Sequence, residues 1–303
     1  MKKDVGIERL PLRRRSGNAN TRLGPLDWII FVILAVFTLL IIYPFYNALL
    51  ISLSPESVIE SEPFLLFPKE ITFASYEYVF KLDIIWSGFR VTMILLIIGT
   101  LYQLFFTTIT GYALSRSNWF GKNFVMNMIL VTMFFGGGLI PYYYLIRSLG
   151  LYDSILVMII PGAIDTFNML LMRNYFASLP KEMEESAKID GANDFVIFLK
   201  IYLPLSLPML ATIGLFFAVG NWNSWYNGML FIERNDLKPL QLVLREVIGK
   251  AKSNIESGST ISETYPKGVQ MAAIFFTIIP MMSFYPFLQR YFVKGIVVGA
   301  IKG

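Results

Sequence analysis

The sequence predicts an all-α polytopic membrane protein with six transmembrane helices, and three observations support this fold class. The 303 residues are 55% hydrophobic and only 16% charged, whereas soluble domains are roughly 45–50% apolar and about 25% charged. The apolar residues gather in blocks that reach the roughly 20 residues an α-helix needs to cross a bilayer. Within the blocks, apolar and polar residues do not alternate as they do in transmembrane β-strands. The blocks lie at 28–52, 87–114, 123–146, 154–177, 205–231 and 268–293.

The distribution of basic residues predicts the orientation. Seven Lys/Arg precede the first block, and an even number of spans places both ends of the chain on one side. If that side is the cytoplasm, inner segments carry 16 of the 26 Lys/Arg, as the positive-inside rule requires. We therefore expect a basic cytoplasmic tail at 1–26, a six-span domain at 27–293 and a cytoplasmic C-terminal tail at 294–303. The first block is too long for a signal-peptide core, so we interpret it as a retained anchor.

The segments between the blocks differ in length. Spans 2 and 3 are joined by the short inner turn Arg116–Lys122, and spans 3 and 4 by an outer turn at 148–150. The outer loops 53–85 and 232–267 are longer, and the first is expected to be ordered. Three glycines at 136–138 should weaken the helix of span 3, which would serve close packing or a hinge equally well.

Missing residue types exclude several kinds of chemistry. The chain has no cysteine and no histidine, which removes thiol chemistry, the usual transition-metal ligands and the commonest general base. It also has no phosphate-binding loop, because Gly121-Lys122 is followed by Asn123 and lacks the upstream glycine. We expect no catalytic residue, no metal site and no cofactor bound by this chain. The net charge of +5 is concentrated ahead of the first span, so nucleic-acid binding is not expected.

A polar segment at 179–204 separates spans 4 and 5 on the inner side. Leu179-Pro180 ends span 4, and a short helix over 181–189 carries acids in its early turns, which complement the helix dipole. Asp190-Gly191 is a helix stop, because glycine adopts the left-handed conformation at low cost. A second helix follows, with one apolar face expected from Phe195, Phe198, Leu199 and Tyr202. This helix–Gly–helix elbow contributes nothing to spanning, so we expect it to dock another protein.

The elbow resembles the EAA loop of bacterial ABC-importer permeases. Glu185, Ala187, Gly191, Ile201, Leu203 and Pro204 fall at the spacing of that motif, and Ser186 stands where alanine is usual. Residues 133–141, 168–176, 222–225 and 289–295 are similar to the carbohydrate-type subfamily. Within it, the chain most resembles the maltose-type second subunit.

The resemblance implies a mechanism and a set of partners. The elbow would seat in a groove on a separate ATPase subunit, and two ATPases holding ATP and Mg²⁺ would rock a pair of permeases. The partners implied are a second permease, two ATPase subunits and an external substrate-binding protein, in a bacterial inner membrane, with an oligosaccharide as substrate. The loop 232–267 either contacts the binding protein or is solvated surface. The residues expected to couple to the ATPase are Glu184, Glu185, Ser186, Ala187, Asp190, Gly191, Ile201, Leu203 and Pro204.

Five residues are candidates for a substrate pathway. Asp165 lies near the middle of span 4, where a carboxylate costs about 2.5–3.5 kcal/mol and should face the bundle or a wet cavity. Asn221, Trp222, Asn223 and Trp225 lie in span 5 and combine rings that stack on sugars with amides that bond hydroxyls. Structural alternatives remain open for both groups: a satisfied contact between helices for Asp165, and an interfacial aromatic belt for the tryptophans.

Two other classes of function compete with an importer subunit. A stand-alone secondary transporter of a small polar solute is disfavoured, because the chain shows no inverted repeat with paired broken helices. A membrane enzyme is disfavoured by the missing histidine, cysteine and acid clusters. Co-purification distinguishes an importer subunit from a secondary transporter, since only the importer subunit requires an ATPase and a second permease.

Overall fold

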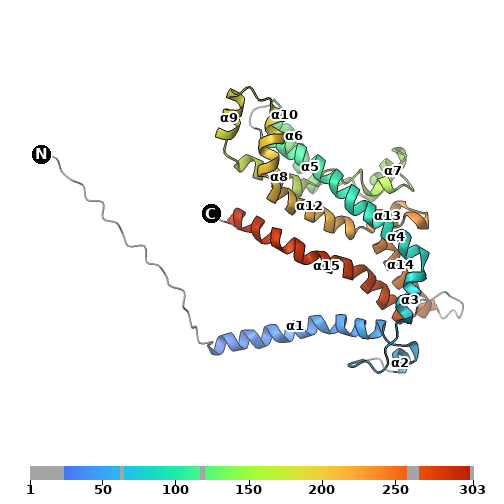
Figure 1. The fold of residues 1–303 in the computed structure, drawn as a ribbon. Coiled ribbons are helices and arrows are strands. Elements are labelled where there is room, and N and C mark those ends of the chain that lie inside the picture. Colours follow the sequence, from blue (N-terminus) through green and yellow to red (C-terminus); the bar gives the residue numbers. More distant parts are fainter. Residues whose placement is uncertain (1–23, 62–64, 117–119, 258–265, 301–303) are drawn as a thin grey trace. The chain divides into compact units, whose positions relative to one another are not determined.

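The computed structural model describes residues 24–61, 65–116, 120–257 and 266–300, and all the regular elements within them are helical (Figure 1). The predicted tail 1–26 therefore lies outside the described residues except for its last few positions. Residues up to Asn47 and residues from Ala48 onward form two units. The first unit holds most of α1 (Pro25–Ser52), a 28-residue helix that is apolar throughout and long enough to cross a bilayer. It confirms the helix of the first predicted span.

The second unit is built around one long helix over Asp83–Ser115. It comprises α4 (Asp83–Ile94), the π-helical turn η1 (Leu95–Gly99) and α5 (Thr100–Ser115), and its 33 residues match the predicted span 2. Two glycines let other helices approach it closely. A Cβ at Gly99 would lie 3.1 Å from the Asn221 amide nitrogen, and one at Gly111 would lie 3.0 Å from the Met172 side chain. α8 and α12 therefore pack directly against this helix.

Span 3 differs from the single helix expected over 123–146. Its residues form α6 (Lys122–Phe134) and α7 (Leu139–Ser148), and the helix direction bends by 117° between them. The helix is interrupted at residues 135–138. Gly138 has φ 84° and ψ 169°, a backbone conformation essentially confined to glycine. The glycine run therefore ends the helix rather than merely loosening it.

Span 4 also differs from the expectation of one helix over 154–177. A 3₁₀ turn, η2 (Ile155–Met158), is followed by irregular backbone, and α8 (Thr166–Ser178) begins only after Pro161-Gly162. Proline removes a backbone donor and disrupts a helix, which explains the late start. Asp165 is consequently the N-cap of α8, not a mid-helix residue. Its carboxylate accepts a hydrogen bond from the Asn168 backbone N–H at 2.8 Å.

The predicted span 5 is divided as well, into α12 (Leu207–Trp222) and α13 (Tyr226–Phe231). In the described part of the chain, two helices are long and apolar enough to cross a membrane, and four if each bent pair is one span. The bent pairs are α6 with α7, and residues 194–205 with α12. The six crossings therefore stay a prediction, and the predicted spans 3, 4 and 5 are not single straight helices.

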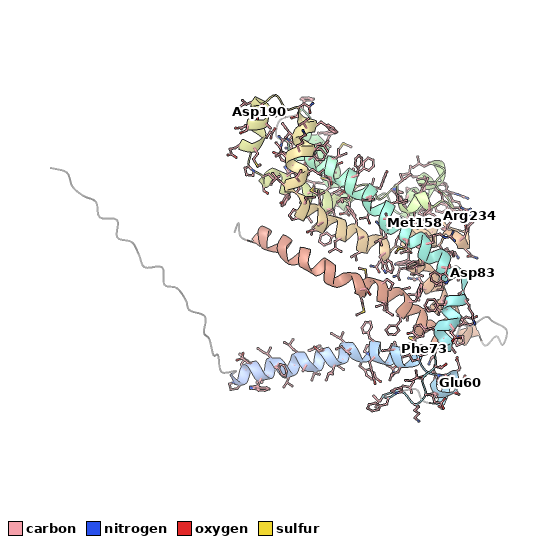
Figure 2. All side chains as sticks on the ribbon, viewed as in Figure 1. Glu60, Phe73, Asp83, Met158, Asp190 and Arg234 are labelled. Carbon is pink, nitrogen blue, oxygen red and sulfur yellow. The ribbon has the colours of Figure 1, made fainter. Side chains whose placement is uncertain are left out.

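Both predicted loops at the far end from the elbow contain helices among their described residues. Segment 53–85 contains α2 (Glu56–Ser61) and α3 (Ala74–Lys81), and segment 232–267 contains η4 (Asn235–Leu237) and α14 (Leu240–Ser257). Leu240, Val243 and Val247 of α14 are buried against α4 and against α15 (Lys267–Ala300). The Leu240 N–H also donates to the Thr92 hydroxyl at 2.9 Å. Asp83 and Arg234 mark this end of the unit, and Asp190 of the elbow marks the other (Figure 2).

Candidate functional site

The elbow consists of two short helical arms joined at Gly191. The first arm is α9 (Glu182–Ile189), and the second is α10 (Asp194–Ile197) with the π-turn η3 (Phe198–Tyr202) and α11 (Leu203–Leu205). Gly191 has φ 82°, its N–H donates to the Lys188 carbonyl, and the Ala192 N–H donates to the Ala187 carbonyl. This pair of bonds is a Schellman motif, the helix ending that favours glycine. The predicted helix stop at Asp190-Gly191 is confirmed.

The second arm turns a different face inward from the one expected. Ile197 and Tyr202 are buried in a cluster with Met172 and Phe176 of α8 and Ile213 of α12. These two elbow residues lie five positions apart, which is the spacing of a π-turn, not of an α-helix. The expectation of a single apolar face over 195–202 was therefore wrong in part. Phe195 is 69% exposed and Leu199 is 41% exposed.

The outward side of the elbow is an exposed surface with apolar side chains. Ile189 at the end of α9 is 87% exposed, and Met183 of α9 and Phe195 of α10 are also exposed. Glu185 is also exposed, and it forms no ion pair within the described part of the chain. Exposed apolar side chains that gather in one patch are typical of protein-binding surfaces.

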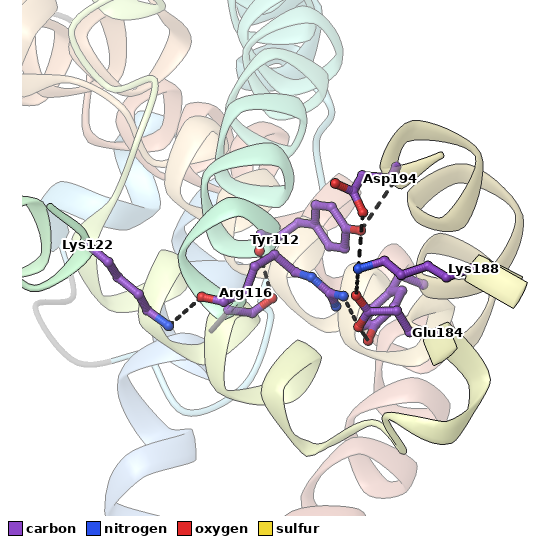
Figure 3. A network of polar contacts seen from close by, with 8 residues as sticks. Tyr112, Arg116, Lys122, Glu184, Lys188 and Asp194 are labelled. Carbon is purple, nitrogen blue, oxygen red and sulfur yellow. Dashed lines mark hydrogen bonds and ion pairs between the residues drawn. The ribbon is translucent and has the colours of Figure 1, made fainter. Parts of the chain in front are cut away.

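The inward side of the elbow carries a network of charged groups (Figure 3). Glu184 forms ion pairs with Arg116 and with Lys188, the second at 2.8 Å, and accepts a hydrogen bond from the Tyr202 hydroxyl at 3.3 Å. Lys188 lies 3.6 Å from the Asp194 carboxylate. These groups line an open cavity of about 760 Å³ between the elbow, the end of α5 and the end of α8.

The remaining predicted coupling residues hold the elbow in shape. The Ser186 hydroxyl donates to the Glu182 carbonyl within α9 at 2.8 Å. Ala187 and Ile201 are half-buried against the cluster around Phe176. Leu203 and Pro204 form the short α11 that leads into α12, and Asp190 is exposed at the tip. The structure thus brings all the predicted residues together in one elbow, but turns them to different sides of it.

A second cavity, of about 410 Å³, lies among α5, α8 and α12 and is lined by polar groups. The Asn221 amide donates to Thr100 Oγ1 at 3.1 Å and to Gln103 Oε1 at 2.9 Å. The buried Asn168 Oδ1 has no hydrogen-bond partner among the described residues. Asp165 lines the same cavity. Its polar lining residues are Gln103, Asp165, Asn168, Asn221, Ser224 and Asn227.

Comparison with known proteins identifies the family. Residues 123–298 match the family described as binding-protein-dependent transport system inner membrane component. The chain belongs to this family. It is 38% identical over 264 residues to protein LplC of Bacillus subtilis, covering 86% of this chain and 90% of LplC. It is 37% identical to the polygalacturonan/rhamnogalacturonan transport system permease protein YtcP of the same organism, covering 91% and 98%.

A solved structure supports the same assignment. A chain of a bacterial ABC transporter involved in the import of the acidic polysaccharide alginate matches with a TM-score of 0.80 and 32% identity. The match covers 88% of this chain and 96% of that one. The resemblance stated from the EAA spacing is thereby confirmed, and the chain is an ABC-importer permease of the inner membrane.

The structure separates the candidate pathway residues of this permease. Asp165 and Asn221 share the polar cavity, whereas Trp222 is buried against Phe89. The exposed Asn223 amide donates to the Val219 carbonyl at 2.8 Å. Trp225 lies in another cavity, of about 460 Å³, where the Arg245 guanidinium is 4.2 Å from its ring centroid.

The candidate list missed four polar residues of this cavity, Gln103, Asn168, Ser224 and Asn227. Three of them are amides within apolar blocks. Uncharged amides inside spans commonly bond between helices or face a wet path, so their positions were a usable indication. No sequence pattern predicts that these residues line one cavity, because their arrangement depends on the break before α8 and the break after α12.

Proposed function

We propose that this permease forms half of the translocation pathway of an ATP-driven oligosaccharide importer. The similar proteins are named for transport of polygalacturonan or rhamnogalacturonan, of arabinooligosaccharides and of alginate, all built of linked sugars. Its partners are a second permease, two ATPase subunits and an extracytoplasmic binding protein. ATP and Mg²⁺ are held by the ATPase subunits, and this chain binds neither.

The elbow is the part of this chain that receives the ATPase movement. The observation that carries this assignment is its two-sided construction: the inner side is packed on α8 and α12, and the outer side exposes Glu185, Ile189 and Phe195. An ATPase groove with a basic residue for Glu185 and an apolar wall for the other two would complement this surface. Closure of the two ATPases then moves both elbows and rocks the permeases between inward-facing and outward-facing states.

The polar cavity is the segment of the pathway that this chain lines. Its amides and the Asp165 carboxylate can exchange hydrogen bonds with sugar hydroxyls in surroundings that otherwise offer apolar side chains. Asn168 Oδ1 is an acceptor there without a partner among the described residues, which fits a site that bonds a transient ligand.

Substitution of Gly191 tests the coupling role. A Gly191→Val side chain has open space around it but must adopt φ near 82°, which costs a non-glycine residue about 1–2 kcal/mol. We expect the altered elbow to lose most of the ATPase that co-purifies with the permease pair, while the chain still inserts into the membrane. Gly136→Val is the matched control, because Gly136 also has open space and no positive φ. Full ATPase retention and uptake by Gly191→Val would contradict the coupling role.

A further inference from the structure

One ion pair of the elbow network joins it to the long helix. Arg116 is the first residue after α5, and Glu184 lies in the first turn of α9. Their side chains are only 23% and 15% exposed. Ion pairs at this level of burial are less screened by salt than surface pairs, and loss of one partner leaves the other charge poorly solvated.

The Arg116 guanidinium is held by more than its charge. It lies over two aromatic rings, 5.2 Å from the Tyr112 centroid and 4.8 Å from the Tyr202 centroid. The two rings contact each other edge to face at 5.2 Å. Tyr112 belongs to α5 and Tyr202 to the second arm of the elbow. The planar guanidinium is therefore fixed in one orientation between the long helix and the elbow.

Glu184 ties both arms of the elbow to the same point. Besides Arg116, it contacts Lys188 of its own arm and the Tyr202 hydroxyl of the other arm. The Tyr112 hydroxyl donates to the Asp194 carbonyl at the start of α10, at 3.3 Å. The contacts converge on the end of α5, as Figure 3 shows for Arg116, Glu184 and Lys188.

The long helix extends this attachment across the unit. Gly111 brings α5 against Met172 of α8, the helix that leads into the elbow. From Ser115 the helix continues to Asp83, and its 33 residues correspond to ~50 Å at 1.5 Å per residue. At its far end α4 packs against α14. If Arg116 passes a displacement of the elbow to this helix, the displacement would therefore reach the contact between α4 and α14.

We propose that the Arg116–Glu184 pair is the joint that makes the elbow and the Asp83–Ser115 helix move as one body. Both are positioning residues, and neither contacts the ATPase. Glu185, the next residue, faces the ATPase instead. This inference rests on the proposed coupling function of the elbow, and assigns the two neighbouring acids to different tasks.

Distance measurements between spin labels test the joint directly. The chain has no native cysteine, so Ile109→Cys on α5 and Glu182→Cys on α9 provide a label pair at two exposed positions outside the network. The assembled transporter is measured without nucleotide and after trapping with Mg-ATP and vanadate. With the joint intact, we expect the same narrow distance distribution in both states. A shift between the two states with the intact joint would overturn the proposal.

Variants of the joint should release the elbow from the helix. In Arg116→Gln and in Glu184→Gln, we expect the distribution to broaden and to shift on trapping, because the elbow follows the ATPase while α5 does not. Arg116→Lys retains the charge but not the planar stacking, so its distribution should lie between those of the native chain and Arg116→Gln. Distributions unchanged in both glutamine variants would also overturn the proposal.

The neighbouring acid supplies the control and separates this inference from the coupling function itself. Glu185→Gln removes one charge from the adjacent position, so it should leave the label distances unchanged and lower the amount of ATPase that co-purifies. Arg116→Gln should change the label distances and leave the amount of co-purifying ATPase unchanged. If Glu185→Gln keeps the ATPase, the docking role fails while the joint can still stand. If Arg116→Gln loses the ATPase with unchanged distances, the joint fails while docking stands.

Discussion

At the scale of single residues, neighbours in the elbow have unlike surroundings. Glu184 is paired with Arg116 and Lys188, while Glu185 is exposed without an ion pair among the described residues. The pair Asp190-Gly191 predicted the conformation of Gly191 correctly, because a helix stop is local chemistry. The EAA spacing could not distinguish the surroundings of the two acids, since Arg116 follows a helix that is far away in sequence. Contacts of that kind are set by packing.

Asp165 is the residue whose environment the sequence misjudged most. It caps α8 at the wall of the polar cavity, where sequence reasoning had placed it inside a helix. Capping satisfies one carboxylate oxygen and lowers the cost of its position. The other oxygen can contact solute in the cavity.

Asp165→Asn tests that role without disturbing the helix, because asparagine caps as well as aspartate. If the cavity carries sugar, a neutral arabinooligosaccharide should enter about fivefold more slowly, since a hydrogen bond to a charged group is about 1 kcal/mol stronger than one to an amide. Uptake of an acidic oligogalacturonate should rise, because a repelling carboxylate is gone. The measurement is uptake by the reconstituted transporter, with Asn223→Asp as a control outside the cavity. Unchanged uptake of both sugars would remove Asp165 from the pathway.

At the scale of helices, the sequence predicted where apolar elements lie better than how they are interrupted. Block lengths indicated α1 and the Asp83–Ser115 helix because these elements are continuous. The breaks at 135–138, 159–165 and 223–225 fall inside apolar blocks, so the average hydrophobicity of a block does not reveal them. The glycine run and Pro161-Gly162 were visible, but sequence alone did not decide between a weakened helix and a broken one. Tertiary contacts made that choice, as at Gly162, where a Cβ would lie 3.1 Å from the Gln103 amide.

The bend between α6 and α7 depends on one backbone conformation. Gly138→Ala should lower the free energy of unfolding by about 1–3 kcal/mol, because the Gly138 dihedral angles are essentially reserved for glycine. Gly137→Ala is the matched control, since its Cβ would meet only Pro141 at 3.9 Å and its φ is not positive. Thermal unfolding of the purified transporter measures both. Equal stability of the two variants would mean that the bend does not depend on Gly138.

At the scale of the whole molecule, this chain is one component of a transport system. Its family is defined by dependence on a binding protein, and the elbow exposes Ile189 and Phe195 on a surface that nothing within the described residues covers. The stand-alone transporter considered from the sequence is accordingly not favoured.

Isolation from the native membrane distinguishes an importer subunit from a stand-alone transporter. Mild detergent extraction of the tagged chain should yield an ATPase and a second permease in stable proportion, because in the function we propose another subunit completes the elbow and the pathway. Mass spectrometry of the purified material identifies them. Solute transport by the chain alone, without ATP, would refute the importer assignment.

The shortness of α8 has a consequence for how the protein is made. Thirteen helical residues extend ~20 Å, which is less than the ~30 Å of the hydrocarbon core. The α8 helix alone is therefore too short to span that core. At Gly111, however, the earlier Asp83–Ser115 helix offers a surface that fits Met172 closely. The Asp83–Ser115 helix precedes α8 in the chain and packs along it, so its surface is already made when α8 is synthesised.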